Sequence, residues 1–308
     1  MFDYPEVFSL IRHLGWLTTT YFWFANASLA ILLVFVLMTF IGPRGSKFTY
    51  VAKFSMFYYL SSMVVSLLAP IFILRPKNVV NCKLGGWFIG KCTYLLGISW
   101  ELRGSHLLRD NVGGIIISNH QSSIDILGMF NLWQFMDRAT AIAKKEILYI
   151  FPLGPVAWLA GITYIDRKSP KDSYKTLSKC VRLMKDDKIK IFMYPEGRRN
   201  DSRSGFLPFK KGAFKTAIHA KVPITPIVQS PLYFVDPKKH IFDSGHVILS
   251  VLDPIKTDDL TDEDTDMLMN KCRDLMLTEF RKLSSEIESK LSNMSWMKEK
   301  RSGMYLKD

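Results

Sequence analysis

The sequence has few of the residues that mark metal-binding, redox or nucleotide-hydrolysing proteins. Its four cysteines form no Cys-x-x-Cys pair, which argues against a zinc site or a dithiol redox motif and fits reduced thiols; they are Cys82, Cys92, Cys180 and Cys272. Neither a Gly-x-Ser-x-Gly nucleophile elbow nor a Gly-x-x-x-x-Gly-Lys-Ser/Thr phosphate loop occurs. We therefore expect no bound metal and no resident cofactor.

Acidic residues are scarce relative to basic ones. The 308 residues include 41 Lys and Arg but 28 Asp and Glu, so the formal net charge is +13. Such an excess attracts an anionic partner, either a nucleic acid or an anionic membrane surface with acidic substrates. Zinc-finger spacing and RNA-binding aromatic signatures are absent, so no nucleic acid is expected. Membrane lipids and phosphate-bearing substrates explain the charge better.

Charged residues are missing from two long apolar stretches near the N-terminus. These are Tyr21–Ile41 and Phe54–Leu74. At ~1.5 Å per residue, a helix of either length can cross the ~30 Å hydrocarbon layer of a membrane. The alternative for each is a buried globular helix. A cleaved signal peptide fits less well because Asp3 and Glu6 precede the first stretch. We predict a two-helix membrane segment within residues 1–80.

Basic residues lie on both sides of the second apolar stretch. The link from Gly42 to Lys53 would turn the chain back, so the catalytic part would face the same side as the N-terminus. Basic residues are enriched on the cytosolic side of membrane helices, so those after the second stretch favour a cytosolic catalytic side. The three basic residues in the link favour the opposite orientation. The two sets are Arg75, Lys77, Lys83 and Lys91 after the stretch, and Arg44, Lys47 and Lys53 in the link. Charge alone leaves the orientation open.

The rest of the chain alternates between strand-like and helix-like segments. Strands are predicted at 115–118, 139–143, 162–166, 189–194, 224–227 and 247–251, and helices at 123–135, 146–158, 169–185, 211–220 and near the C-terminus through residue 291. The alternation indicates an α/β domain over residues 81–292, with a mixed sheet flanked by helices and a basic tail at 293–308. The aromatic-rich segment Leu84–Trp100 predicts a helix, either in the membrane interface or packed against the sheet.

The segment Ile115–Asp125 brings a histidine and an aspartate into one turn. The β-branched run Ile115–Ile117 predicts a buried strand, and His120 and Asp125 follow it. An imidazole beside a carboxylate is suited to removing a proton from a hydroxyl, with His120 as general base and Asp125 as its orienting group. The alternative is a helix capping box, Ser122-x-x-Asp125, in which the aspartate serves backbone amides only.

A second strand, Ile189–Tyr194, ends in a charged turn. Pro195 and Gly197 make this turn tight, and Glu196, Arg198 and Arg199 charge it. Arginine grips phosphate through paired donors, so the turn is a candidate phosphate site. The alternative is a solvated basic loop.

Several motifs in order resemble those of the glycerolipid acyltransferase family, and within it the 1-acylglycerol-3-phosphate (lysophosphatidic acid) acyltransferases of the animal α/β type. The resemblance covers roughly positions 20 to 285. The motifs that carry it are Asn119–Asp125, Ala143–Glu146, Gly161–Arg167, Tyr194–Gly197 and Val222–Val228. One position departs from the pattern: the family usually has Thr where this chain has Arg198, which could point to solvent, add a phosphate contact or impair the turn.

The resemblance implies acyl transfer from acyl-CoA to the sn-2 hydroxyl of lysophosphatidic acid, with acyl-CoA as co-substrate. It implies phosphate contacts from Arg199 and Arg167, with Lys144 a further candidate, and a role for Glu196 and Gly197 in ordering the site or touching the acceptor. Backbone amides after the histidine are candidate donors to the developing oxyanion. The implied location is the endoplasmic reticulum membrane with a cytosolic catalytic side.

Three other functions remain open from the sequence. A related acyltransferase could use glycerol-3-phosphate or another lysophospholipid as acceptor. A catalytically inactive membrane protein could bind lipid without turnover. A peripheral hydrolase could use the same histidine with water and release free fatty acid. Acyl chain length, oligomeric state and protein partners are not indicated by any motif.

Overall fold

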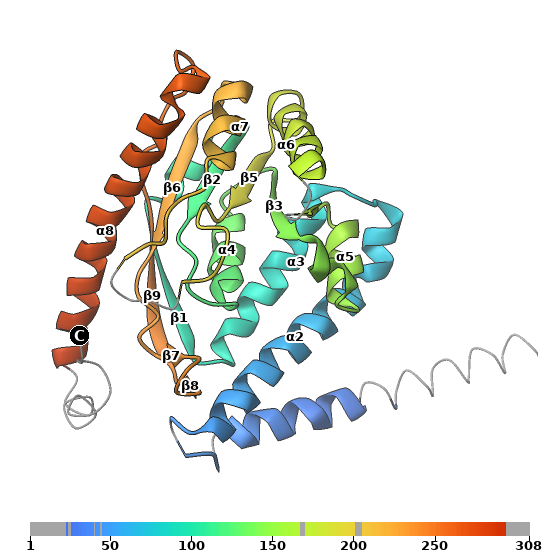
Figure 1. Cartoon of the computed structure of the whole chain (residues 1–308). Coiled ribbons are helices and arrows are strands. Elements are labelled where there is room, and N and C mark those ends of the chain that lie inside the picture. Colours follow the sequence, from blue (N-terminus) through green and yellow to red (C-terminus); the bar gives the residue numbers. More distant parts are fainter. Residues whose placement is uncertain are drawn as a thin grey trace, which may run out of the picture.

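The protein is built around a mixed seven-stranded sheet (Figure 1). The computed structural model describes residue 23 and residues 26–39, 41–43, 45–166, 170–200 and 205–293. The strand order is β1-β9-β6-β2-β5-β3-β4. The strands are β1 (Ile98–Arg103), β2 (Gly114–Ser118), β3 (Ala139–Lys144), β4 (Thr163–Ile165), β5 (Lys190–Met193), β6 (Ile224–Gln229) and β9 (Gly245–Val251). A separate hairpin joins β7 (Val235–Asp236) to β8 (Ile241–Phe242).

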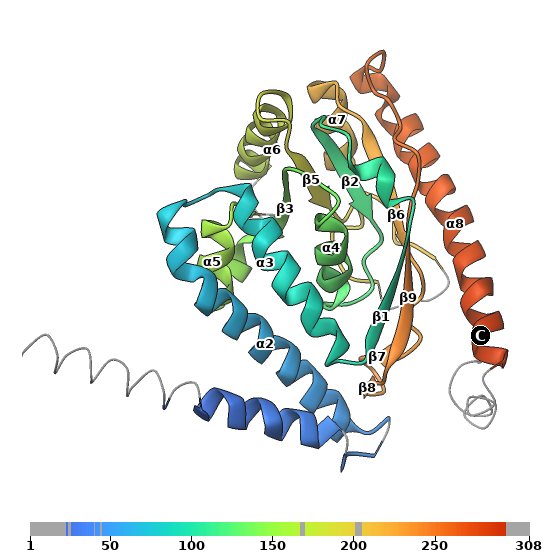
Figure 2. The same cartoon turned by 180° about the vertical axis from the view of Figure 1, so that it is seen from behind.

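Helices cover both faces of the sheet (Figures 1 and 2). One face carries α2 (Lys47–Leu74), α3 (Val79–Lys91), α4 (Asp125–Trp133) and α5 (Leu153–Leu159), and the other carries α6 (Pro170–Lys185), α7 (Gly212–Ala220) and α8 (Thr265–Asn293). Each face of the sheet has its own hydrophobic core, and successive side chains of a strand point to opposite faces. Ile116 therefore lies in the core under α2 to α5, and Ile115 and Ile117 lie in the core under α6 to α8. The predicted α/β sheet flanked by helices is confirmed.

The segment after α2 differs from its prediction. Residues 84–100 were expected to form one helix, and this is wrong: α3 ends at Lys91, and the edge strand β1 begins at Ile98. β1 pairs in parallel with β9, a partner almost 150 residues away that no local pattern reveals. Helix α3 packs closely on α4. Gly86 of α3 faces Phe130 of α4, whose ring would lie 3.1 Å from a Cβ added at Gly86.

The N-terminal apolar segment also differs in detail. Among the described residues, α2 is the one helix long and apolar enough to cross a membrane; the apolar helix Asn26–Thr39 is shorter, and the rest of the first predicted span lies largely outside the described residues. α2 begins seven residues before the predicted Phe54. Lys53, assigned to the link, is therefore a buried helical residue, and its Nζ donates to the Leu96 carbonyl at 2.9 Å.

The two helices present apolar side chains outward. Tyr59 of α2 donates to the Ser28 carbonyl at 3.0 Å and its ring contacts Phe35, so the helices pack together. Exposed apolar side chains continue along both helices and in the turn before α5: Leu29, Leu33, Val34, Val51, Leu67, Ile73, Leu74 and Phe151. An apolar surface of this extent is unusual on a protein surrounded by water and is typical of a membrane or protein contact.

The strand directions determine where the functional residues gather. β6, β2, β5, β3 and β4 are mutually parallel, and β9 is antiparallel to β6. The carboxyl ends of the five parallel strands therefore lie at one edge of the sheet, where open α/β sheets bind ligands. The turns after β2 and β5 adjoin because these strands are neighbours.

Candidate active site

The predicted base and its carboxylate meet at the carboxyl end of β2. His120 Nδ1 lies 2.8 Å from Asp125 Oδ2. The Asp125 side chain is 1% exposed and the His120 side chain 22%. The carboxylate thus accepts the Nδ1–H and leaves Nε2, which contacts no hydrogen-bonding group among the described residues, free to receive a proton.

Asp125 also accepts backbone amides, as the capping-box alternative expected, but these amides lie before α4, which begins at Asp125 itself. Its Oδ2 accepts the backbone N–H groups of Gln121 at 2.5 Å and Ser122 at 2.9 Å, and its Oδ1 accepts Nε2 of Gln229 at 2.9 Å. Four donors thus converge on one buried carboxylate. Because the backbone amides are fixed by the turn, they lock the carboxylate that orients the imidazole, so the cap and the catalytic pair are one structure.

The same contacts limit which amides can bind an oxyanion. Backbone amides after His120 were the candidate donors, but Gln121 and Ser122 donate to Asp125, and the amide of His120 itself donates to Glu196 Oε1 at 2.9 Å. These three N–H groups already have acceptors that are charged or buried. They cannot also point at a substrate oxygen without breaking the pair.

Glu196 joins two loops. Its two oxygens accept the backbone amides of His120 and Leu207, at 2.9 and 2.8 Å. The residue is 3% exposed. Burial raises the pKa of its carboxyl group, and the two amide donors oppose that shift. Glu196 therefore ties the loop that carries His120 to the loop that carries Leu207.

Two residues that the sequence analysis missed hold the imidazole in place. The Tyr194 ring stacks on the His120 ring with centroids 3.9 Å apart and planes 14° apart. Gln229 reaches Asp125 from the end of β6, and its backbone exchanges hydrogen bonds with the Asn119 side chain at 2.8 and 3.0 Å. Tyr194 lies within a quoted motif and Gln229 directly follows another, but only the strand pairing shows that they face the histidine.

The charged turn after β5 is intact despite its unusual residue. Gly197 has φ +71°, and its amide donates to the Tyr194 carbonyl at 3.1 Å. The positive φ favours glycine here, and a Cβ would lie 2.8 Å from the end of the flexible Lys210 side chain, which would have to move. Arg198 and Arg199 are both exposed, and Arg199 interacts electrostatically with Tyr50 of α2. Arg198 therefore does not impair the turn.

The remaining predicted phosphate contacts lie further along the same edge. Lys144 ends β3, which is two strands from β2, or about 10 Å at the usual strand spacing. It is half exposed and pairs with Glu146 at 3.1 Å. Arg167 would follow β4 but lies outside the described residues. The structure thus joins His120 and Asp125 to Glu196 and leaves Lys144 apart from them.

The described residues contain no cluster of three or more histidine, cysteine, aspartate or glutamate side chains that could hold a metal ion. What the site offers instead is a half-buried imidazole on a buried carboxylate, beside a turn with two exposed guanidinium groups. Such a pair can take a proton from a hydroxyl, and the guanidinium groups can hold an anionic substrate near it.

The sequence and the fold match those of known acyltransferases. Residues 99–230 match the acyltransferase family model. The chain is 38% identical to human 1-acyl-sn-glycerol-3-phosphate acyltransferase alpha, over 70% of this chain and 76% of that protein, and 34% identical to the human beta protein, over 83% and 91%. The crystal structure of the 1-acyl-sn-glycerophosphate (LPA) acyltransferase PlsC from Thermotoga maritima shares the fold, with a TM-score of 0.52 and 17% identity over 73% of this chain and 95% of that one. The chain belongs to the 1-acyl-sn-glycerol-3-phosphate acyltransferase family.

Proposed function

We propose that the protein is an acyl-CoA-dependent 1-acyl-sn-glycerol-3-phosphate acyltransferase that makes phosphatidic acid, with His120 as general base. The observation that carries the proposal is the 2.8 Å contact between His120 Nδ1 and the buried Asp125 carboxylate, which leaves Nε2 for the substrate. The names of the relatives support the acceptor, because the human alpha and beta proteins are both 1-acyl-sn-glycerol-3-phosphate acyltransferases.

The reaction proceeds by direct attack. His120 Nε2 accepts the proton of the sn-2 hydroxyl as its oxygen bonds to the thioester carbonyl carbon. The negative charge moves to the carbonyl oxygen, and Asp125 stabilises the imidazolium formed. Collapse of the tetrahedral intermediate breaks the C–S bond, and the leaving thiolate takes the proton from the imidazolium. The products are phosphatidic acid and CoA, and no covalent enzyme intermediate is needed.

The acceptor phosphate binds to the exposed basic residues at this edge of the sheet. Arg199 follows Glu196 by three residues and lies at the surface, so a phosphate can reach it from solvent or from a membrane. Lys144 and Arg167 are further candidates, carried by the family resemblance. A guanidinium can hold two phosphate oxygens at once, which fixes the acceptor more firmly than a single ammonium.

The enzyme acts at a membrane, in our proposal that of the endoplasmic reticulum with the active site on the cytosolic side. The exposed apolar faces of α2 and of the helix Asn26–Thr39 support membrane association. Both substrates carry long acyl chains, so a site beside the lipid phase can take them without first moving those chains through water.

The test is product formation from labelled oleoyl-CoA and 1-acylglycerol-3-phosphate by protein in detergent micelles or liposomes, with His120→Ala in parallel. We expect phosphatidic acid from the native protein and at least a thousandfold lower rate from the variant. Release of free fatty acid would indicate a hydrolase instead. Acylation of glycerol-3-phosphate or lysophosphatidylcholine alone would refute the acceptor, and no turnover with any acceptor would refute catalysis.

A further inference from the structure

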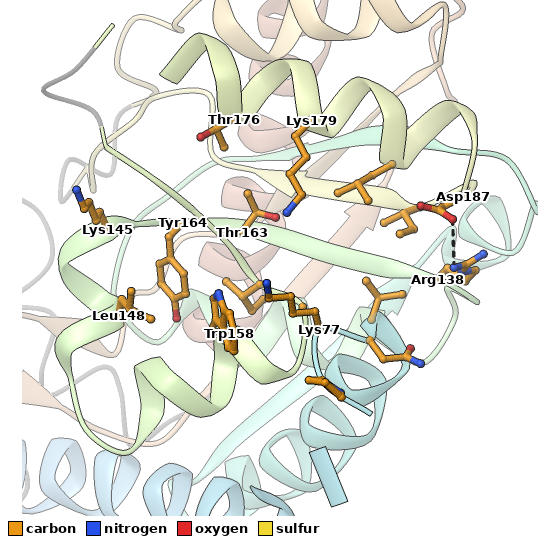
Figure 3. A pocket seen from close by; sticks show the side chains of 17 residues that line it. Lys77, Arg138, Lys145, Leu148, Trp158, Thr163, Tyr164, Thr176, Lys179 and Asp187 are labelled. Carbon is orange, nitrogen blue, oxygen red and sulfur yellow. Dashed lines mark ion pairs between the residues drawn. The ribbon is translucent and has the colours of Figure 1, made fainter. Parts of the chain in front are cut away.

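A pocket of about 610 Å³ lies at the β4 edge of the sheet, beside the site described above (Figure 3). Its walls come from the loop after α2, from β4, from α5 with the segment before it, and from α6. Figure 3 shows Lys179 extending from α6 toward Thr163 on β4, with Lys77 and Trp158 on the facing wall. His120 and Asp125 are not among the lining residues, so the pocket is separate from the catalytic pair.

The pocket is electropositive. Four cationic side chains line it, Lys77, Arg138, Lys145 and Lys179, against the single acid Asp187, which gives 4 − 1 = +3. Arg138 lies 3.8 Å from Asp187, and Lys145 pairs with Asp166 at 3.3 Å. Within the part of the chain that the structure describes, no carboxylate pairs with Lys77 or Lys179. Two ammonium groups are therefore available to an anion.

The wall opposite α6 is already held in place. Lys77 has φ +59°, an unfavourable backbone conformation for a side chain of its size, and its N–H donates to the Leu159 carbonyl at 2.7 Å. Its Nζ lies 4.4 Å from the centre of the Trp158 ring. Asn81 adds hydrogen bonds to the carbonyls of Arg75 and Leu159, at 2.8 and 3.3 Å. The ammonium is thus held over one face of the indole without a ligand.

We propose that this pocket binds the nucleotide end of the CoA thioester, with its phosphates on Lys77 and Lys179 and its adenine against Trp158. The proposal rests on the proposed function, which makes acyl-CoA the donor. The ammonium groups, which pair with no carboxylate, can bind the phosphates, and the exposed indole can stack on the aromatic adenine ring. The volume falls within the ~300–1,000 Å³ of small-molecule sites.

The position of the pocket fits a long bipartite substrate. β4 is three strands from β2, which is about 14 Å at the usual spacing. CoA has a flexible pantetheine arm between its nucleotide and its thioester, so the nucleotide can be held at β4 while the thioester reaches the histidine. Lys145 directly follows β3 and lines the pocket, so it lies between the two places.

Direct binding of adenosine 3′,5′-bisphosphate to the full chain in detergent micelles tests the proposal without turnover. Lys179→Ala should weaken binding about tenfold, since one charge-assisted contact is lost. Lys185→Ala is the matched control, because it removes the same charge from the same helix outside the pocket, and it should leave binding unchanged. Trp158→Leu should weaken binding of the nucleotide but not of inorganic diphosphate. No binding by the native chain, or equal losses in the two lysine variants, would overturn the proposal.

A kinetic measurement locates the effect on one substrate. Lys179→Ala should raise KM for acyl-CoA about tenfold while kcat and KM for the acceptor stay within twofold. If the native enzyme turns over but the KM for acyl-CoA does not change in Lys179→Ala, the pocket proposal fails and the proposed function stands. If the nucleotide binds as expected but no acceptor is acylated, the pocket binds nucleotide and the proposed function fails. Loss of binding to phosphatidic acid vesicles in Lys179→Ala, with nucleotide binding intact, would make a lipid headgroup the ligand and overturn the assignment.

Discussion

Replacing Asp125 by asparagine separates the charge of the carboxylate from its shape. Oδ2 of Asp125 faces three N–H donors, from His120 Nδ1 and from the amides of Gln121 and Ser122. Because the two amides cannot turn away, the asparagine carbonyl oxygen must take the Oδ2 position. Its NH2 group then faces Gln229, whose side-chain amide can rotate to present oxygen. The imidazole should therefore keep its tautomer and lose only the charge of its partner.

The expected rate loss follows from that missing charge. Two unit charges about 4 Å apart attract by about 4 kcal/mol at an effective dielectric constant near 20, and a tenfold rate change corresponds to about 1.4 kcal/mol. We expect Asp125→Asn to lower kcat for phosphatidic acid formation by roughly a thousandfold, with KM for both substrates nearly unchanged. Its urea unfolding midpoint should fall less than that of Asp125→Ala, which leaves four donors without an acceptor in a side-chain position that is 1% exposed.

The assay is steady-state conversion of labelled lysophosphatidic acid in detergent micelles, with unfolding followed by circular dichroism. A kcat within tenfold of native, together with a large loss of stability, would show that Asp125 is only a cap and would refute its role beside the imidazole. A kcat lowered by about ten-thousandfold or more would show that the tautomer is lost, contrary to the argument from the fixed amides.

Two further predictions concern the groups that hold the fold around the site. Glu196→Gln should lower the free energy of unfolding by about 2 kcal/mol, because its NH2 group must face one of two backbone donors; an unchanged urea midpoint would contradict this. Arg103 bridges Glu101 of β1 and Glu286 of α8, and its guanidinium lowers the pKa of both carboxyl groups from 4.5 to about 2. Since the folded pKa values lie below the unfolded ones, the stabilisation is full above about pH 4.5 and is lost as pH falls toward 2. The difference in urea midpoint between native protein and the Glu101→Gln, Glu286→Gln double variant should shrink over that range, and a constant difference would contradict the assignment.

The local patterns of the sequence predicted most strands of the sheet and the proximity of His120 and Asp125. Ile115–Ile117 form a buried strand, and His120 and Asp125 meet in the turn after it, as their spacing indicated. Local patterns failed where distant segments decide the structure. β1 was missed because its stability comes from pairing with β9, and Lys53 was misplaced in a loop because its acceptor, the Leu96 carbonyl, is far along the chain.

The sequence by itself determined the alternation of strands and helices, the pair of residues that can move a proton, and the family, because each depends on residues close together along the chain. Only the tertiary structure decided what surrounds that pair. Parallel pairing of β2 with β5 and β6 brings Tyr194, Glu196 and Gln229 to the histidine turn. These contacts join residues more than seventy positions apart, so the burial and strand register that create them cannot be deduced from any local pattern.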